Sequence, residues 1–156
     1  MILLPKNWPA WVNTLSNEQV QPAGVDLTVK KISRFKTEGI LSVDNNDRVI
    51  SEVDDLKIIN SFFSLTPGAY MVRYNEEIQI PENTIGLVFP RSSLMRMGAT
   101  IHTAVWDPGY KGKGISLLTV YNNLKIQVNS RISQLILIKT EDTPNTLYNG
   151  IYQNEK

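Results

Sequence analysis

Short runs in which apolar residues alternate with polar ones, or are continuous, dominate the chain. In GVDLTVKKI, residues 24–32, Val25, Leu27 and Val29 fall at every second position. Side chains of a strand reach the same face of a sheet at that period. Further apolar runs are short and rich in β-branched and aromatic residues, as strands are; they cover residues 69–74, 84–89, 114–122, 124–128 and 133–138. The pattern predicts a strand in each run.

Turn residues lie between these runs. The segments TPG, IPEN, DPGYKGKG and YNN carry Gly, Pro and Asn, which favour the backbone conformations of tight turns. Helix is expected only over 9–16 and 91–97, and residues 51–63 are ambiguous between helix and strand. The 156 residues contain no internal repeat and no linker. We therefore expect one all-β domain, a sandwich or barrel, with residues 1–20 as an N-terminal extension and 140–156 as a mobile tail.

Composition excludes several kinds of site. The sequence contains no cysteine, so it has no disulfide, no thiolate zinc site and no thiol nucleophile, and a cytoplasmic location is the simplest expectation. The first residues are interrupted by Pro5 and Pro9 and predict neither a signal peptide nor a membrane span. The formal net charge of +1 gives no global attraction to a nucleic-acid polymer. We expect no membrane or nucleic-acid partner, and any bound anion must be held by a local cluster of charges.

The first such cluster is FPRSSLMRMG, residues 89–98. Arg91 and Arg96 supply guanidinium groups, and Ser92 and Ser93 supply hydroxyl donors near the expected start of a helix. Arginine can contact phosphate oxygens through two parallel N–H groups, and a helix start favours an anion. A capped surface helix with two solvated arginines is the more common arrangement of such residues. Phosphate binding and solvation are therefore both open at this point.

Asp107 is the only carboxylate between Gly86 and Asn129, a stretch that also contains five lysines and arginines. Pro108 stiffens the turn that follows, and the glycines at 109, 112 and 114 let a ligand come close to the backbone. The carboxylate can act as a general base if it reaches a water molecule, or it can accept a hydrogen bond from its own backbone in an Asx turn. From the sequence alone, the turn is the stronger interpretation.

Polar residues elsewhere leave several alternatives open. Asp26 lies in the alternating run, where it can pair with Arg91, hold a metal-bound water or be an exposed strand acid. Arg131 and Gln134 precede an apolar strand and are ordinary edge residues unless a ligand reaches them. His102 is the only histidine, so we expect a packed strand residue and no zinc site.

Four segments gain significance from their order along the chain. They are PAGVDL (22–27), PRSSLMRMG (90–98), AVWDPGYKG (104–112) and NSRISQLI (129–136). In sequence and in order they resemble the first four motifs of the trimeric dUTPases and the related dCTP deaminases, and the resemblance covers roughly residues 20–138. It implies a distorted jelly-roll-like β-barrel, a homotrimer with active sites between subunits, and hydrolysis of dUTP to dUMP and diphosphate with Mg²⁺.

The resemblance also implies roles for single residues. Asp107 would be the base that deprotonates the water attacking the α-phosphate, and Asp26 would act on the metal through water. The phosphate chain would be bound by Arg91, Ser92, Ser93, Arg96 and Gln134. The nucleoside would be bound by Thr103, Ala104, Trp106 and Tyr110. Tyr110 would lie against the deoxyribose and leave no room for a ribose 2′-hydroxyl.

The two branches of this superfamily differ in one acid. In the deaminases a glutamate stands two residues before an aromatic-Asn pair; here the pair is Tyr121–Asn122 and the corresponding residue is Thr119. The stretch from Lys111 to Asn129 contains no Asp or Glu at all. Because deamination needs that acid to move protons, dUTP hydrolysis is favoured. The alternatives are a dCTP deaminase, a bifunctional deaminase and dUTPase, and a non-catalytic nucleotide-binding β module.

Two features are closer to the deaminase branch. The second motif continues through Arg96, and the chain ends in TLYNGIYQNEK in place of the glycine-rich, arginine-containing fifth motif of typical dUTPases. We expect Tyr148, Tyr152 and Gln153 to lie over the bound nucleotide. The alternative is a frayed terminus.

Overall fold

A computed structural model of the chain describes residues 1–8 and 10–156. Within them the protein is nearly all-β, with one short α-helix, α1 (Ser92–Arg96). The strands are β1 (Ile2–Leu3), β2 (Val25–Phe35), β3 (Val53–Asp55), β4 (Phe62–Leu65), β5 (Gly68–Tyr74), β6 (Ile78–Gln79), β7 (Thr84–Pro90), β8 (Ala99–His102), β9 (Lys111–Gly112), β10 (Ile115–Val120), β11 (Leu124–Gln127) and β12 (Arg131–Lys139). Short 3₁₀ turns span Pro5–Asn7, Asn17–Gln19 and Asn45–Asp47.

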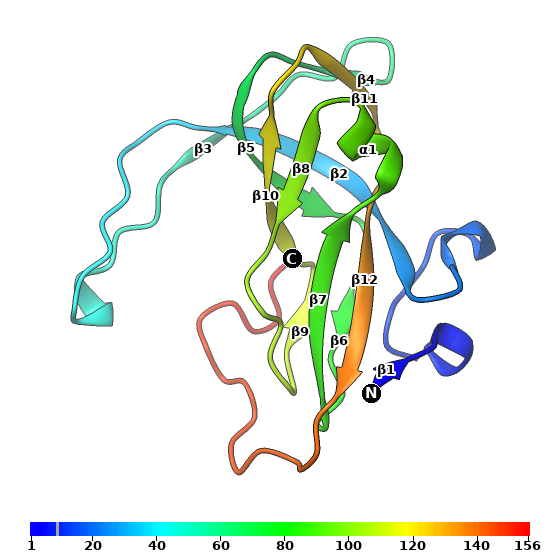
Figure 1. The fold of residues 1–156 in the computed structure, drawn as a ribbon. Helices are drawn as coiled ribbons and strands as arrows, with labels where there is room; N and C mark the ends of the chain where they lie inside the picture. Colours follow the sequence, from blue (N-terminus) through cyan, green and yellow to red (C-terminus); the bar gives the residue numbers. More distant parts are fainter. Residues whose placement is uncertain (9) are drawn as a thin grey trace.

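Eight of the strands form one curled antiparallel sheet (Figure 1). Its order is β1-β12-β2-β5-β10-β8, with β3 beside β2 and β7 beside β12, while β4 pairs with β11 and β6 with β9. β2 connects two layers, because its first residues pair with β12 and its later residues pair with β5. The register of its pairing with β5 shifts between Val29 and Lys31. A bulge of this kind bends a strand and lets it pass from one layer to the next. The result is the all-β architecture that the apolar pattern predicts, in the jelly-roll-like form that the family resemblance implies.

The core lies between these layers. The alternating residues Val25, Leu27 and Val29 are at most 1% exposed, as their period predicts. Asp26 and Thr28, on the other face of β2, are buried as well, because that face is also covered. β2 is therefore buried on both sides where it carries the first motif, and the exposed alternative for Asp26 is wrong.

The helix predictions have mixed outcomes. Helix α1 forms inside the predicted segment 91–97. The prediction for 9–16 includes Pro9, which lies outside the described residues; residues 10–16 form a turn and an isolated bridge, not a helix. Val12 pairs with Ile78 and is buried, so this segment uses its backbone to extend a sheet. The ambiguous residues 51–63 contain β3 and the start of β4.

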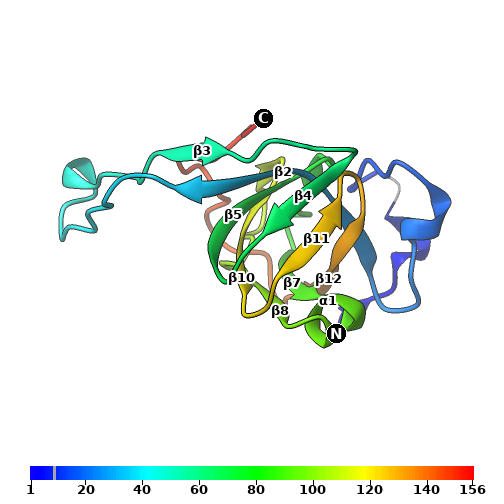
Figure 2. The same ribbon diagram turned by 90° about the horizontal axis from the view of Figure 1, so that it is seen from above.

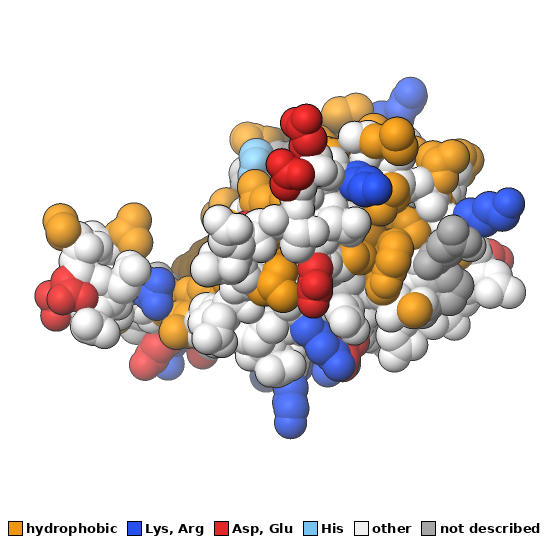
Figure 3. All heavy atoms as spheres, turned by 90° about the horizontal axis from the view of Figure 1, so that it is seen from below, with side chains coloured by type: hydrophobic (Ala, Val, Ile, Leu, Met, Phe, Trp, Pro, Cys, Tyr) orange, Lys and Arg blue, Asp and Glu red, His pale blue; other side chains and the backbone are white. Residues whose placement is uncertain are grey.

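Two parts of the chain lie outside the curled sheet. Residues 36–52 project as an arm between β2 and β3 (Figure 2), and hydrophobic side chains at its end are exposed (Figure 3), among them those of Leu41 and Val43. Residues 140–156 run back along the lower part of the molecule toward β9 (Figure 1). No helix among the described residues is both long enough and apolar enough to span a membrane.

Candidate functional site

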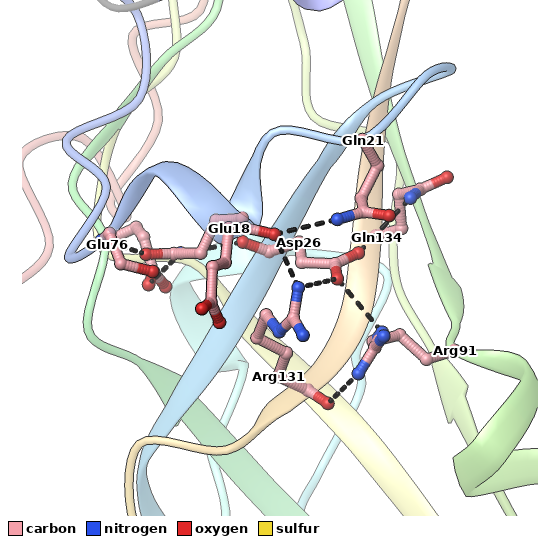
Figure 4. A network of polar contacts seen from close by, with 9 residues as sticks. Glu18, Gln21, Asp26, Glu76, Arg91, Arg131 and Gln134 are labelled. Carbon is pink, nitrogen blue, oxygen red and sulfur yellow. Dashed lines mark hydrogen bonds and ion pairs between the residues drawn. The ribbon is translucent and has the colours of Figure 1, made fainter.

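Three of the four motifs meet at Asp26 (Figure 4). β2 and β12 are neighbours and place Asp26 opposite Gln134, whose Nε2 donates to Asp26 Oδ1 at 3.2 Å. Arg91 directly follows β7, which also pairs with β12, and its Nε lies 3.0 Å from Asp26 Oδ2. Arg131 Nη1 lies 3.5 Å from the same oxygen. Segments more than a hundred residues apart along the chain thus share one carboxylate.

A β-bulge brings Arg131 to this cluster. Residues three apart on a regular strand point to opposite faces, so Arg131 and Gln134 should not both reach Asp26. The register of β12 against β2 shifts between Arg131 and Ser133, which adds one residue and returns both side chains to one face. The sequence interpretation of Arg131 as an ordinary edge residue is wrong for this reason.

The cluster carries more positive than negative charge. Two guanidinium groups face one carboxylate, and the arginine side chains remain about 30% exposed while that of Asp26 is 1% exposed. Burial raises the pKa of Asp26, and the neighbouring Arg91, Gln134 and Arg131 offset this only in part. Arg91 Nη1 also donates to the carbonyl of Arg131 at 3.3 Å, which fixes its guanidinium. A partly exposed, oriented pair of arginines is suited to an anion such as phosphate.

A second buried carboxylate fixes the backbone that carries Asp26. Glu76 is fully buried and accepts hydrogen bonds from Gln19 Nε2 at 2.8 Å, from Thr28 N–H at 3.0 Å and from the Thr28 hydroxyl at 2.5 Å. Gln19 Nε2 also donates to the carbonyl of Asp26 at 2.8 Å. β2 is therefore tied on both sides of Leu27. No local sequence signal points to Glu76, because its partners are distant in sequence.

The remaining predicted phosphate ligands lie on α1. Ser92 and Ser93 are exposed in its first turn, next to Arg91 at the N-cap. Arg96 is exposed in the last turn, at the other end of this short helix. The structure thus brings Arg91 and Gln134 together, places the two serines beside them, and leaves Arg96 outside the cluster around Asp26.

Asp107 is exposed at the start of a tight turn. The N–H of Tyr110 donates to the backbone carbonyl of Asp107 at 3.0 Å, and the N–H of Gly109 donates to the carbonyl of Ile80 at 3.1 Å. An Asx turn would need the Gly109 N–H for the Asp107 side chain. That group is already used, so the turn forms through the backbone alone and the Asp107 carboxylate faces solvent.

Within one chain, Asp107 lies far from the cluster around Asp26. Trp106 pairs with Gly86 through backbone bonds of 2.8 and 3.0 Å, and Asp107 continues toward the start of β7. Arg91 follows the opposite end of that strand, five residues beyond Gly86, which corresponds to roughly 16 Å at about 3.3 Å per residue. A base must lie within hydrogen-bond reach of the proton it takes. Asp107 and Arg91 of the same chain therefore cannot act on one phosphate.

The predicted nucleoside ligands are divided between a surface hollow and the core. Thr103 and Ala104 line a shallow hollow of about 380 Å³, together with the exposed side chain of His102. The prediction that His102 is packed is wrong, because its position on β8 points toward this hollow. Trp106 and Tyr110 are buried, and burial raises the pKa of Tyr110 to about 12, so its hydroxyl stays neutral. Trp106 has no free backbone group for a base, since Gly86 occupies both.

The predicted tail residues lie against the Asp107 turn. Tyr148 packs edge-on against Tyr110, with ring centroids 5.6 Å apart. The side chain of Gln153 bonds to the backbone of Gly109 and Lys111. Tyr152 is exposed. This segment therefore packs along the third motif of its own chain. That it lies over a bound nucleotide stays a prediction.

The described residues place no acid beside Thr119 for deamination and form no cluster of acids for a metal ion. Thr119 pairs with Ala69 and Thr100 on the neighbouring strands, none of which carries a carboxylate at that level. Within residues 1–8 and 10–156, no group of three or more His, Cys, Asp or Glu residues could hold a metal ion. Asp26 Oδ2 has no hydrogen-bond donor, but two guanidiniums already surround it. These residues therefore do not fit a direct ligand set for a divalent cation.

Comparison with known proteins places the chain in a family. A family model described as dCTP deaminase-like matches residues 9–140. A protein of Aeropyrum pernix named probable deoxyuridine 5′-triphosphate nucleotidohydrolase is 42% identical over 142 residues, which are 90% of this chain and 88% of that protein. A protein of Methanocaldococcus jannaschii named deoxyuridine 5′-triphosphate nucleotidohydrolase is 39% identical over 145 residues, 90% of this chain and 91% of that one.

Solved structures agree with this at the level of the fold. A 2′-deoxycytidine 5′-triphosphate deaminase from Agrobacterium tumefaciens matches with a TM-score of 0.66 at 20% identity; the match covers 87% of this chain and 47% of the deaminase chain. A dUTPase of Staphylococcus bacteriophage 80alpha matches with a TM-score of 0.53 at 14% identity, over 90% of this chain and 96% of that one. The chain belongs to the dCTP deaminase-like family, whose relatives at about 40% identity are named as dUTP nucleotidohydrolases.

Proposed function

We propose that the protein is a dUTP diphosphatase, which hydrolyses dUTP to dUMP and diphosphate. The observation that carries this proposal is the cluster in which Arg91, Arg131 and Gln134 surround the buried Asp26. A net positive, oriented and partly exposed pair of arginines suits a triphosphate, and phosphoryl transfer needs mainly positioning and charge stabilisation. Relatives named for this activity support the choice of substrate.

The proposed chemistry uses Asp107 as the general base. Its exposed carboxylate takes a proton from a water molecule whose oxygen bonds to the α-phosphorus. The bond between the α-phosphorus and the oxygen bridging to the β-phosphate breaks, and diphosphate leaves with the electron pair. Arg91, Ser92 and Gln134 bind the phosphate oxygens on which charge builds up.

The separation of Asp107 from Arg91 within one chain leads to an assembly. We propose that Asp107 of one copy meets the cluster around Asp26 of another, in the homotrimer that the family resemblance implies. A separation of roughly 16 Å along β7 is too long for a shared water, whereas a neighbouring copy can supply the missing group. The site is then incomplete in a monomer.

Magnesium enters this proposal with the substrate. Mg²⁺ is commonly bound by substrate phosphates, waters and one or two carboxylates, and it neutralises charge on the phosphates. Because two guanidiniums occupy the surroundings of Asp26, that residue would act only through water. A cytoplasmic location, which the absence of cysteine favours, is part of the same proposal.

The competing function within the family is deamination of dCTP. Thr119 supplies no acid where the deaminases carry their glutamate, which disfavours this reaction and the bifunctional alternative. The non-catalytic alternative is disfavoured because Asp107 is retained and exposed. Deoxyribose selection by Tyr110, which is buried in the single chain, stays a prediction.

One assay separates these functions. The protein is incubated with dUTP, dCTP and UTP separately in the presence of Mg²⁺, and diphosphate and ammonia are measured. We expect diphosphate from dUTP, far less from UTP, and no ammonia from dCTP. Ammonia from dCTP would establish a deaminase, and no product from any nucleotide would favour a binding module.

A further inference from the structure

Residues 147–156 form an added edge on the turn that follows Asp107. The N–H of Tyr148 donates to the carbonyl of Pro108 at 2.8 Å, and the N–H of Asn154 donates to the carbonyl of Lys111 at 2.7 Å. The N–H of Lys113 donates to the carbonyl of Glu155 at 2.8 Å, and Glu155 forms a parallel bridge with Gly112. The segment is therefore bonded along the whole turn, from Pro108 to Lys113.

The side chain of Gln153 bridges this turn with two hydrogen bonds. Its Oε1 accepts a hydrogen bond from the N–H of Lys111 at 2.9 Å, and its Nε2 donates to the carbonyl of Gly109 at 3.0 Å. Both the oxygen and the nitrogen of the amide have a partner. Because one partner is a donor and the other an acceptor, the orientation of the amide is fixed. The two backbone groups flank Tyr110, so the amide closes the turn in the way that a neighbouring strand would.

Backbone hydrogen bonds also hold the turn: Ile80 bonds to the N–H of Gly109 and to the carbonyl of Tyr110, and β9 pairs with β6. Gly109 has a φ of +82°, a conformation that a glycine readily leaves for others. The Asp107 side chain has no hydrogen bond or ion pair with any described residue, so only the backbone of the turn determines its position. A displacement of about 1 Å in a reacting group can cost on the order of a hundredfold in rate. The position of this backbone therefore affects the rate at which Asp107 can act as a base.

Arg73 holds the end of the segment through an ion pair and a hydrogen bond. Arg73 Nη2 lies 3.4 Å from Glu155 Oε1, and Arg73 Nη1 donates to the carbonyl of Lys156 at 2.7 Å. Both side chains of the ion pair are about one-fifth exposed. At the other end Leu147 packs so closely on Gly109 that a Cβ there would come within 2.9 Å of it. The segment is thus anchored on both sides of Gln153.

We propose that Gln153 is a positioning residue, which holds the turn after Asp107, and hence the carboxylate, in place before any nucleotide binds. Segment 147–156 then acts as a splint on the third motif of its own chain, in contrast to a lid that closes over the nucleotide. The catalytic part of this inference rests on the proposed dUTP hydrolysis. The mechanical part, the holding of the turn, does not.

Amide hydrogen exchange of the full chain without nucleotide tests the mechanical part. The Lys111 amide should be protected in the wild-type protein, and Gln153→Ala should speed its exchange by roughly tenfold or more, while amides of β10 stay unchanged. Asn149→Ala, an exposed amide in the same segment, is the matched control and should leave Lys111 protected. Protection of Lys111 that arises only when dUMP is added would overturn the splint and favour a lid.

Steady-state kinetics with dUTP test the catalytic part. A displaced base lowers kcat with little effect on substrate binding, so Gln153→Ala should reduce kcat roughly ten- to a hundredfold and leave KM within about twofold. A large rise in KM with unchanged kcat would refute the positioning role. If the wild-type protein does not hydrolyse dUTP, the proposed function fails, and the exchange experiment still decides whether Gln153 holds the turn.

Discussion

Gly114→Ala is expected to destabilise the protein through one defined collision. A Cβ at Gly114 would lie 2.4 Å from Cζ2 and 2.6 Å from Cη2 of Trp106, well inside contact distance. Trp106 cannot retreat, because its backbone is bonded in both directions to Gly86 and its ring packs against Tyr74 and Tyr110. Something in the core must therefore move.

The magnitude follows from two opposing effects. Overpacking a close-packed core costs about 1–3 kcal/mol, and a ring held on several sides favours the upper part of that range. Replacing glycine by alanine restricts the unfolded chain and returns about 0.4–1 kcal/mol. We expect Gly114→Ala to lower the free energy of unfolding by about 1–2 kcal/mol.

Urea denaturation of both variants measures this difference. Gly39→Ala is the matched control, because the one close contact of its Cβ would be the movable hydroxyl of Ser51 at 2.8 Å, and the next atoms lie at ordinary contact distance; its effect should stay within about 0.5 kcal/mol. In a double-mutant cycle, adding Trp106→Phe should remove most of the penalty of the Gly114 change. A Gly114→Ala protein as stable as wild type, or additive effects in the cycle, would refute the collision.

Three further predictions concern the proposed active site. Asp107→Asn should reduce turnover of dUTP by about 10²–10⁴-fold while nucleotide binding, followed by calorimetry, persists; near-normal turnover would remove Asp107 as the base. Arg91→Ala should weaken binding of dUTP far more than that of deoxyuridine, and equal losses would argue for a purely structural arginine. Burial raises the pKa of Asp26, so between pH 3.8 and that higher value the folded protein keeps a proton that the unfolded chain has lost. Stability relative to Asp26→Asn should therefore fall as the pH rises through this window and level off above it, and a rise measured by urea denaturation would contradict the burial argument.

Local patterns predicted six of the twelve strands in the described part of the chain, and helix α1. The apolar runs became β2, β5, β7, β10, β11 and β12, and α1 formed in the predicted place, because strand period, turn residues and a helix start are properties of neighbouring residues. The segment 10–16 did not form a helix, since Val12 gains more by pairing with Ile78. A short window of sequence does not show whether a segment can pair with a distant strand, and this pairing can replace a local helix.

The order of the motifs predicted much of the candidate site. Asp26, Arg91 and Gln134 were named from the sequence and lie together, although Asp26 and Gln134 are 108 residues apart. Arg131 and Glu76 were missed. Arg131 depends on a bulge whose position no local signal gave, and Glu76 depends on burial against Gln19 and Thr28.

The sequence by itself determined the chemistry that is available: strands without cysteine, two arginine-bearing motifs, Asp107 as the one acid between Gly86 and Asn129, and no acid at Thr119. Only the tertiary structure decided which groups meet. It buried Asp26 between two guanidiniums, separated Asp107 from them along β7, and laid Gln153 on the turn after Asp107. Side-chain period and turn preference act over a few residues, whereas strand pairing, bulges and burial are set by contacts between distant parts of the chain.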